Sequence, residues 1–215
     1  MSRSSRFGRA ISKLFYTSIL FENVLQFELY GCQSVLDLGC GGPNNNTWLA
    51  NMPIPRKTGV DIFAPYIELR KKEGKYTDCI VADIAKVEFK DRSFDAVVSF
   101  DVLEHLTKTE GETLLDKANR WARRKVIIYM PNGYLRQGEW DNNIYQTHKS
   151  GWSCNDFRAR GYRVLGMGGL KCLHKEMGVL KYRPERLWST IDFLCKPLIY
   201  KVPVIAQELL CIKEI

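Results

Sequence analysis

A short apolar run that ends in clustered glycines holds the first residues of chemical interest. Residues 35–38 read V-L-D-L, and residues 39–43 read G-C-G-G-P. Glycines at the end of a strand let the backbone approach a ligand closely, and Asp37, two positions before Gly39, suits a cofactor that carries an ammonium group. The alternative is a dinucleotide site with the pattern G-x-G-x-x-G. However, Asn44 stands at its third glycine position, and the charge of Asp37 would repel a pyrophosphate.

Carboxylates also end the next two apolar segments. Asp61 closes G-V-D at about the 20-residue distance from the first glycine at which a ribose-binding carboxylate is expected, where it can accept hydrogen bonds from two hydroxyls. Asp83 closes V-A-D and is placed to accept from an adenine amino group, with the Ile84 amide beside the ring and Ile62 and Phe63 against its face. The plainer alternatives are an ordinary strand-end aspartate for Asp61, a capping aspartate for Asp83, and core apolar residues for Ile62 and Phe63.

The fourth segment carries the most specific pattern. Residues 93–106 read S-F-D-A-V-V-S-F-D-V-L-E-H-L. With the preceding D-x-G-x-G, V-D and A-D, this pattern resembles the class I S-adenosylmethionine (SAM)-dependent methyltransferases, in particular the small-molecule branch called type 11. The resemblance covers residues 33–131. The chain departs from that family where Pro43 replaces the third loop glycine and N-N-N follows, so we expect a differently shaped loop around the methionine part of the donor.

The resemblance implies a fold and a cofactor. The fold is α/β: a Rossmann-like, doubly wound sheet of seven strands with the last strand antiparallel, in three α/β/α layers. The donor, SAM, would lie across the carboxyl ends of the first strands, as ligands do in open α/β sheets. The cofactor-binding positions that the resemblance implies are Asp37, Gly39, Cys40, Gly41, Asp61, Ile62, Asp83, Ile84, Phe100 and Asp101.

Two histidines are the candidates for catalysis. Methyl transfer from a sulfonium is an in-line displacement, so the protein must above all align the nucleophile, and a general base is required only if the nucleophile begins protonated. His105 follows the fourth segment, and His148 lies in Q-T-H-K-S-G-W. The alternatives are structural: a turn residue that hydrogen-bonds the scaffold for His105, and a loop or helix-cap contact for His148.

The same region also raises a metal hypothesis. Asp101, Glu104 and His105 form D-x-x-E-H, and with His148 they are similar to the metal site of ubiquinone-pathway O-methyltransferases and small-RNA terminal 2′-O-methyltransferases. Carboxylates and imidazoles together suit a divalent ion that lowers the pKa of an acceptor hydroxyl. The first position is Asp where those enzymes have Glu, which shortens its reach, and from the sequence we assign no metal.

Residues 132–150 mix amides with aromatic rings. Long ordered loops tend to carry function, and this mixture suits a sugar or another polyhydroxylated acceptor; a well-packed surface loop is the alternative. Arg136 and Lys149 are candidates to meet a phosphate. The amide and aromatic residues, with one tryptophan just beyond the loop, are Asn132, Tyr134, Gln137, Trp140, Asn142, Asn143, Tyr145 and Trp152.

The apolar pattern predicts the elements that position these residues. Strands that alternate with helices indicate a parallel sheet covered on both faces. We expect an N-terminal helical cap at 1–33 and a methyltransferase domain at 34–215, with residues 170–203 forming an insertion or lid between the last two strands. Strands are expected at 34–38, 58–62, 79–82, 94–100, 125–130, 162–167 and 205–213. Helices are expected at 7–31, with a second short helix at 22–30, and at 47–51, 64–73, 109–123 and 153–160.

Composition narrows the class of protein. The net charge of +8 on 215 residues favours anionic partners. Seven cysteines without a C-x-x-C pair argue against a disulfide framework or zinc ribbon and favour a reducing compartment, so we expect a cytoplasmic protein. The run at 187–206 is too interrupted by charges and prolines to span a membrane, and it predicts a lid helix or an interfacial patch. The basic N-terminus fits structural use better than a transit peptide.

Two functions therefore fit the sequence. The first is SAM-dependent methylation, chiefly O-methylation, of a small molecule or glycan precursor, with peripheral membrane contact as an option. The second is an RNA-directed methyltransferase or nucleic-acid-binding module with a SAM fold. The positive charge supports the second function, whereas the lack of an N-P-P-Y-like motif and of a separate binding domain weighs against it. A catalytically silent scaffold is a third reading, and the oligomeric state is left open.

Overall fold

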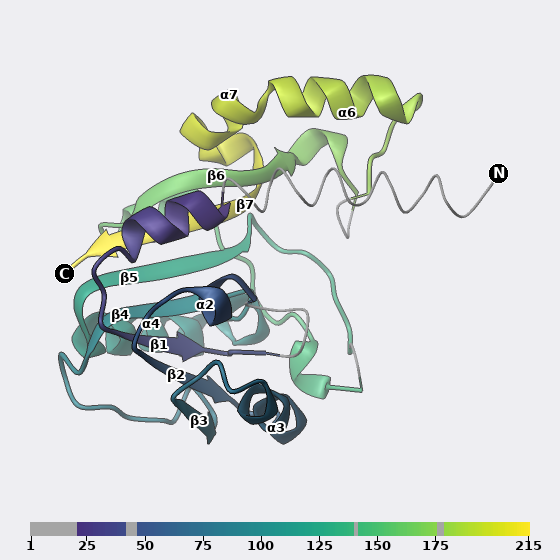
Figure 1. Cartoon of the computed structure of the whole chain (residues 1–215). Helices are drawn as coiled ribbons and strands as arrows, with labels where there is room; N and C mark the ends of the chain where they lie inside the picture. Colours follow the sequence, from purple (N-terminus) through teal and green to yellow (C-terminus); the bar gives the residue numbers. More distant parts are fainter. Residues whose placement is uncertain (1–20, 42–46, 140–141, 176–178) are drawn as a thin grey trace. The chain divides into compact units, whose positions relative to one another are not determined.

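The chain divides into two units, residues 1–31 and 32–215. Figure 1 labels the helices and strands and colours them by their position in the sequence. The computed structural model describes residues 21–41, 47–139, 142–175 and 179–215. In the first unit, residues 21–28 form an α-helix, close to the short helix predicted at 22–30. The rest of the predicted N-terminal helix, from residue 7 to residue 20, lies outside the described residues.

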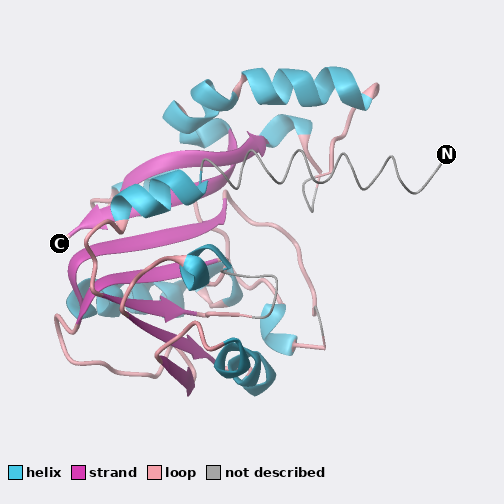
Figure 2. Ribbon diagram, viewed as in Figure 1, coloured by secondary structure: helices cyan, strands magenta, loops and turns pink. Residues whose placement is uncertain are grey.

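The second unit is built on a seven-stranded sheet, whose strands Figure 2 shows in magenta. The strand order is β3-β2-β1-β4-β5-β7-β6, and β7 runs antiparallel to both of its neighbours. This confirms the predicted fold class, including the antiparallel last strand. The strands are β1 (Ser34–Leu38), β2 (Arg56–Asp61), β3 (Asp78–Val81), β4 (Phe94–Phe100), β5 (Ala122–Pro131), β6 (Arg163–Leu170) and β7 (Ala206–Glu214).

Helices cover both faces of the sheet. Every residue of β1 is buried, as expected for a parallel strand with helices on both sides. On one face, Leu36 and Leu38 share a core cluster with Trp121, and on the other Cys40 packs with Ile67 and Tyr76. The helices of this part are α2 (Thr47–Asn51), α3 (Ala64–Glu73), α4 (Lys108–Trp121) and α5 (Cys154–Arg158).

Local signals set the ends of the main helices. A capping box between Thr107 and Glu110 begins α4, and Gly74, with φ of 64°, ends α3. The predicted helix 109–123 was too long at its end, because Ala122 already pairs with Phe94 of β4. The chain therefore passes from α4 directly into β5.

An insertion with two helices connects β6 to β7. The helices are α6 (Glu185–Leu194) and α7 (Lys196–Lys201). A Cβ on Gly166 of β6 would lie 2.1 Å from the carbonyl oxygen of Ile199, so α7 packs directly on that strand. Leu187, Phe193 and Leu194 of α6 are exposed. No helix in the described ranges has the length and hydropathy needed to cross a bilayer, and the lid role of the insertion stays a prediction.

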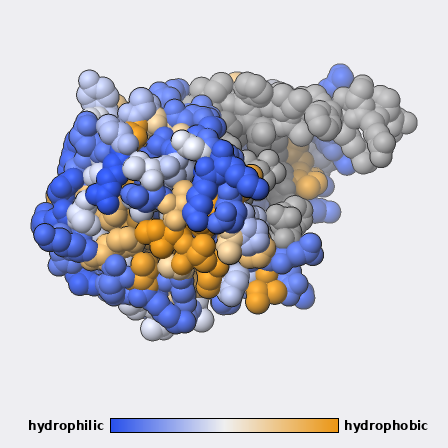
Figure 3. Space-filling view, turned by 60° about the horizontal axis from the view of Figure 1, so that its bottom comes forward, coloured by the Kyte–Doolittle hydropathy of each residue, from blue (hydrophilic) through white to orange (hydrophobic). Residues whose placement is uncertain are grey.

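The outer edge of the sheet carries a surface pocket. The pocket has a volume of about 610 Å³, and the residues that line it include Arg56, Asp78 and Phe94. Figure 3 shows the molecule from the side of β3 and α3, with apolar residues gathered in a patch among hydrophilic ones. Because Arg56 and Asp78 begin their strands, this pocket lies away from the carboxyl ends at which the predicted cofactor residues stand.

Candidate active site

The glycine loop after β1 requires glycine at its first position. Gly39 and Gly41 have φ of 75° and 63°, a left-handed conformation that favours glycine. A Cβ on Gly39 would lie 2.3 Å from a methyl carbon of Val102. The amides of Gly39 and Cys40 donate to the carbonyl oxygen of Val60 at 2.8 and 3.1 Å. The loop is thus held between the end of β2 and the segment that follows β4.

Asp37 lies beneath this loop and is fully buried. The hydroxyl of Tyr76 donates to its carboxylate at 2.5 Å. Burial and the charge of Asp37 raise the pKa of Tyr76 well above its usual range, so that the phenol stays a donor. This contact orients the carboxylate; its predicted role toward the amino-acid end of a donor stays a prediction.

A buried arginine supports the same loop from α3. Arg70 is fully buried, and its Nε and Nη2 atoms donate to the carbonyl oxygen of Cys40 at 3.1 and 2.8 Å. It also pairs with Glu73 at 2.8 Å. Sequence reasoning missed Arg70 and Tyr76. The one available signal was the spacing of Arg70 from Ile67 and Tyr66, which puts it on the buried side of the helix.

The carboxylate of Asp61 joins the end of β2 to the glycine loop. It accepts from the amide of Gly41 at 3.0 Å and from the amide of Phe63 at 2.9 Å. Burial raises the pKa of Asp61, although these amide contacts favour its charged form. Ile62 and Phe63 are half-buried beside it. The aspartate therefore shapes the loop, whatever further group it accepts from.

Asp83 follows β3 and begins a turn. Its carboxylate accepts from the amide of Ala85 at 3.0 Å and pairs with Lys86 at 3.1 Å. These are the contacts of a capping aspartate, one of the alternatives left open from the sequence. Ile84 is buried, so only part of this segment remains accessible to a ligand.

The segment after β4 turns sharply into a 3-10 helix at Leu103–His105. Phe100 is buried, and Asp101, with φ of 53°, donates its amide to the carbonyl oxygen of Tyr129 at 2.8 Å. Glu104 is only 3% exposed, and its Oε2 atom has no hydrogen-bond partner. Burial, with the nearby Asp101, raises the pKa of Glu104 well above its usual range.

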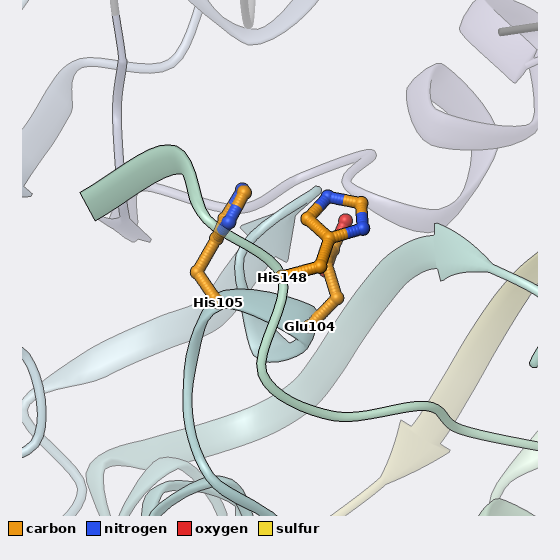
Figure 4. Close-up of side chains that lie close together, drawn as sticks. All are labelled: Glu104, His105 and His148. Carbon is orange, nitrogen blue, oxygen red and sulfur yellow. The ribbon is translucent and has the colours of Figure 1, made fainter. Parts of the chain in front are cut away.

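The structure brings His105 and His148 together. Their ring centroids lie 4.8 Å apart at an edge-on angle (Figure 4). The reason is a backbone contact: the amides of Lys149 and Ser150 donate to the carbonyl oxygen of Glu104 at 2.7 and 3.1 Å. Burial and the neighbouring His148 lower the pKa of His105 to about 4, and burial also lowers the pKa of His148. Both rings are therefore neutral near pH 7.

Trp152 fixes this segment in the core. It is 1% exposed, and its indole N–H donates to the hydroxyl of Ser150 at 3.0 Å. A Cβ on Gly111 of α4 would lie 2.4 Å from the indole ring, so the helix and the ring are in close contact. The Nζ atom of Lys108 lies 3.7 Å from the ring centroid. Trp152 thus positions the histidine segment and does not line an acceptor site.

The loop that was predicted to bind the acceptor contains both structural and exposed residues. Asn132 is buried and donates to the carbonyl oxygens of Pro203 and Ala206 at 3.1 and 2.8 Å, so it holds the end of the insertion. Tyr134 and Tyr145 are exposed. Asn143 accepts from the Tyr145 amide, the side-chain amide of Gln137 donates to the Gln146 carbonyl oxygen, and Asn142, Arg136 and Lys149 are exposed. Trp140 lies outside the described residues.

A further acidic group comes from β7. The hydroxyl of Tyr129 on β5 donates to the carboxylate of Glu208. Glu208 lies close enough to Asp101 and Glu104 for its charge to raise the pKa of Glu104. Sequence reasoning missed Glu208, because a single acid in the last strand gives no signal of what it will face.

Comparison with known proteins agrees with this geometry. Residues 36–130 match the family model described as a methyltransferase domain. An uncharacterized methyltransferase of Mycobacterium bovis is 40% identical over 116 residues, and proteins from two strains of Mycobacterium tuberculosis match equally. The match covers 51% of this chain, which spans 57% of the length of each of these relatives.

Solved structures show the same fold. A SAM-dependent methyltransferase from Archaeoglobus fulgidus matches over the whole of both chains, with a TM-score of 0.60 and 19% identity. The N1-methyltransferase for 1,6-didemethyltoxoflavin from Burkholderia thailandensis, solved with S-adenosylhomocysteine (SAH), matches 97% of this chain and 82% of its own, with a TM-score of 0.57 and 13% identity.

The strand order, the glycine loop and the match over residues 36–130 agree on one fold. The second unit has the fold of class I SAM-dependent methyltransferases, as the sequence predicted, and residues 36–130 match the methyltransferase-domain model. The Archaeoglobus fulgidus protein is described as SAM-dependent, and the Burkholderia thailandensis enzyme was solved with SAH bound.

Proposed function

We propose that this chain transfers the methyl group of SAM to an oxygen of a small molecule or glycan precursor. One observation carries the proposal: Asp37, Asp61 and Asp83 end or follow three adjacent parallel strands, beside a loop with two left-handed glycines. Polar groups at such neighbouring strand ends are where open α/β sheets bind nucleotides. The relatives' description as methyltransferases supports the same activity.

Each aspartate has a distinct part in donor binding. Asp61 is fixed by two backbone amides and can accept from ribose hydroxyls with its remaining lone pairs. Asp37, oriented by Tyr76, carries the charge that would balance the ammonium group, directly or through water. Asp83 is already engaged in its own turn, so it contributes only a lone pair to the adenine amino group.

On the acceptor side, a hydroxyl must lose its proton when its oxygen attacks. The oxygen would form a bond to the methyl carbon as the carbon–sulfur bond breaks, and the electron pair of that bond would stay on sulfur as the thioether of SAH. His105 lies in the turn that follows β4, His148 lies beside it, and both are candidates to accept the proton. The exposed Tyr134 and Tyr145 would face a polyhydroxylated acceptor.

Calorimetry with SAH tests donor binding. The unmodified chain should bind SAH in a one-to-one ratio, and Asp61→Asn should weaken the affinity at least about tenfold, because asparagine replaces one of the two acceptor oxygens, which now serve Gly41 and Phe63, with an NH2 group that can only donate. Asp91→Asn is the matched control, since Asp91 is exposed and pairs only loosely with Arg120 at 3.7 Å. No heat with well-folded protein would refute the proposal.

A transfer assay then addresses the acceptor. Protein with radiolabelled SAM should label hydroxylated small molecules or glycan precursors. RNA is the second candidate, supported by the net charge of +8. Retention on RNA that falls steeply with salt, because phosphate contacts release counterions, together with label in RNA, would favour it over a small acceptor.

A further inference from the structure

We propose that Glu104, His105 and His148 form a binding site for one divalent transition-metal ion of the first row. The metal hypothesis weighed from the sequence involved four residues, whereas the structure groups three of them as a candidate site. Figure 4 shows the three side chains converging from the 3-10 turn after β4 and from the segment that follows the long loop.

The donor atoms lie close enough to share one ion after the side chains rotate. One ligand atom from each residue lies within 4.8 Å of the other two. Ligands that are about 2.1 Å from a shared ion lie at most about 4.2 Å from one another. In a tetrahedral site such ligands lie about 3.4 Å apart, so the side chains must approach by up to about 1.4 Å, which rotation about their own bonds has to supply.

Glu104 provides the observation that points to a ligand. It is 3% exposed, and its Oε2 atom lacks a partner in the described structure. A buried polar atom without a partner costs free energy, and each such atom in a native structure calls for an explanation, of which a bound ion is one. An ion held between Glu104 and the two rings would satisfy this oxygen.

Backbone carbonyl groups orient both imidazoles. The Nδ1 atom of His148 lies 2.6 Å from the carbonyl oxygen of Leu135, and Nδ1 of His105 lies 3.4 Å from that of Thr147. When Nδ1–H donates to a carbonyl group, Nε2 keeps its lone pair for a metal. Carbonyl partners of this kind are the usual outer support of histidine ligands.

The site is held together without an ion. Lys149 and Ser150 donate their amides to the carbonyl oxygen of Glu104, and the Ser150 hydroxyl donates to the carbonyl oxygen of Leu103 at 3.2 Å. His148 therefore lies next to a segment that is bonded to the turn bearing the other two ligands. Such pre-organisation lowers the cost of assembling the site.

The donor set selects the class of ion. Two imidazoles and one carboxylate resemble catalytic zinc sites, which keep at least one position open, and imidazole also suits iron, nickel and copper. Mg²⁺ prefers oxygen ligands and retains its waters. The carboxyl groups of Asp101 and Glu208 lie close enough to act on Glu104 and would favour a cation, whereas the positive charge of Lys149 acts on His105 in the opposite sense.

The role of this ion rests on the function proposed above. Its open position would take the acceptor oxygen and lower the pKa of the hydroxyl. The proton then leaves to solvent, the oxygen bonds to the methyl carbon, and the electron pair of the broken carbon–sulfur bond stays on sulfur. The two histidines are ligands in this scheme, and neither one is the general base.

Cobalt(II) provides a binding assay that is independent of turnover. The full chain is freed of metal with a chelator, and Co²⁺ is added while the visible absorption is recorded. We expect one equivalent to give ligand-field bands of a site with nitrogen and oxygen donors, and Zn²⁺ to displace it. Mg²⁺ at the same concentration should leave the bands unchanged. Sulfur-to-cobalt charge-transfer bands would instead assign binding to the cysteines and overturn the proposal.

Variants assign the site to its residues. Glu104→Gln and His148→Gln should each weaken Co²⁺ and Zn²⁺ binding at least about tenfold, because even outer-shell changes cost that much. His174→Gln is the matched control: the ring is buried, and its Nδ1 also faces a backbone carbonyl group, that of Leu170, but it is not one of the three grouped residues. Circular dichroism and thermal unfolding show whether each variant folds. If one of the two ligand variants fails to fold, the other still tests the site.

Measuring metal binding and SAH binding on the same samples tests the metal site and the methyltransferase function separately. Absence of stoichiometric Co²⁺ binding, or binding unchanged in both ligand variants, overturns the metal site. SAH affinity is measured on the same metal-free samples. If SAH binds and metal does not, only the metal site is lost; if metal binds and SAH does not, the methyltransferase proposal is lost while the metal site stands.

Discussion

Replacing Gly39 by alanine tests how the glycine loop is built. Two independent features of the structure oppose a side chain at this position. The backbone has φ of 75°, which costs an L-residue roughly 1–2 kcal/mol. The new Cβ would also lie 2.3 Å from one methyl carbon of Val102 and 3.2 Å from the other. Because Val102 is itself buried, it has little room to move away.

The two effects can be summed. Overpacking in a filled core costs about 1–3 kcal/mol, so Gly39→Ala should destabilise the chain by about 2–5 kcal/mol in all. At roughly 2–4 °C per kcal/mol for a domain of this size, the melting temperature should fall by about 4–20 °C. SAH affinity should fall as well, since the loop that carries Cys40 and Gly41 would be displaced.

Gly74 supplies a matched control. Its φ is 64°, close to that of Gly39, but a Cβ there would meet nothing within 4 Å. Gly74→Ala should therefore cost only the conformational part, about 1–2 kcal/mol, and leave SAH binding unchanged. Both changes reduce the entropy of the unfolded chain alike, so this effect cancels in the comparison.

Differential scanning calorimetry of the two variants and of the double mutant Gly39→Ala/Val102→Ala tests whether contact with Val102 destabilises Gly39→Ala. Removing the valine methyl groups should restore part of the loss, with a coupling energy of about 0.5–3 kcal/mol. The reasoning is refuted if Gly39→Ala unfolds at the same temperature as Gly74→Ala, or if the double mutant shows strictly additive losses.

Three further changes probe the supports of the site. Gly111→Ala would place its Cβ 2.4 Å from the Trp152 ring and should cost about 1–3 kcal/mol; a raised melting temperature, as helix propensity alone predicts, would contradict the packing. Arg70→Met removes two hydrogen bonds to the glycine loop and should lower the free energy of unfolding in urea by about 2–4 kcal/mol, an unchanged urea midpoint being the contrary result. Tyr76→Phe leaves Asp37 without this donor and should cost about 1.5–3 kcal/mol in thermal unfolding; an SAH affinity equal to wild type would argue against an ammonium contact at Asp37.

Much of the fold was predictable because its signals are local. An apolar run of four or five residues that ends in glycine or aspartate predicts a buried strand, and β1 and β4 begin and end where the sequence placed them. Where prediction erred, tertiary pairing decided. Residues 122–124 have the composition of a helix end, but Ala122 pairs with Phe94, which draws the segment into β5.

The supports of the loop could not be predicted in the same way. Tyr76 and Arg70 act on Asp37 and on the Cys40 carbonyl group from positions 39 and 30 residues further along the chain. A tyrosine in a connecting segment and an arginine in a basic helix end have many ordinary uses. Only the three-dimensional packing shows that one donates to the buried carboxylate and the other to a backbone oxygen.

The pairing of His105 with His148 brings together two segments that are far apart in the sequence. The two residues were selected from the sequence separately, each with a structural alternative, and both alternatives are partly true: backbone carbonyl groups of the scaffold hold each ring. Because a single carbonyl oxygen, that of Glu104, accepts from Lys149 and Ser150, the turn that follows β4 also fixes the segment beyond the long loop. A change in that turn must therefore alter both the end of β4 and the place of His148, because one backbone contact joins them.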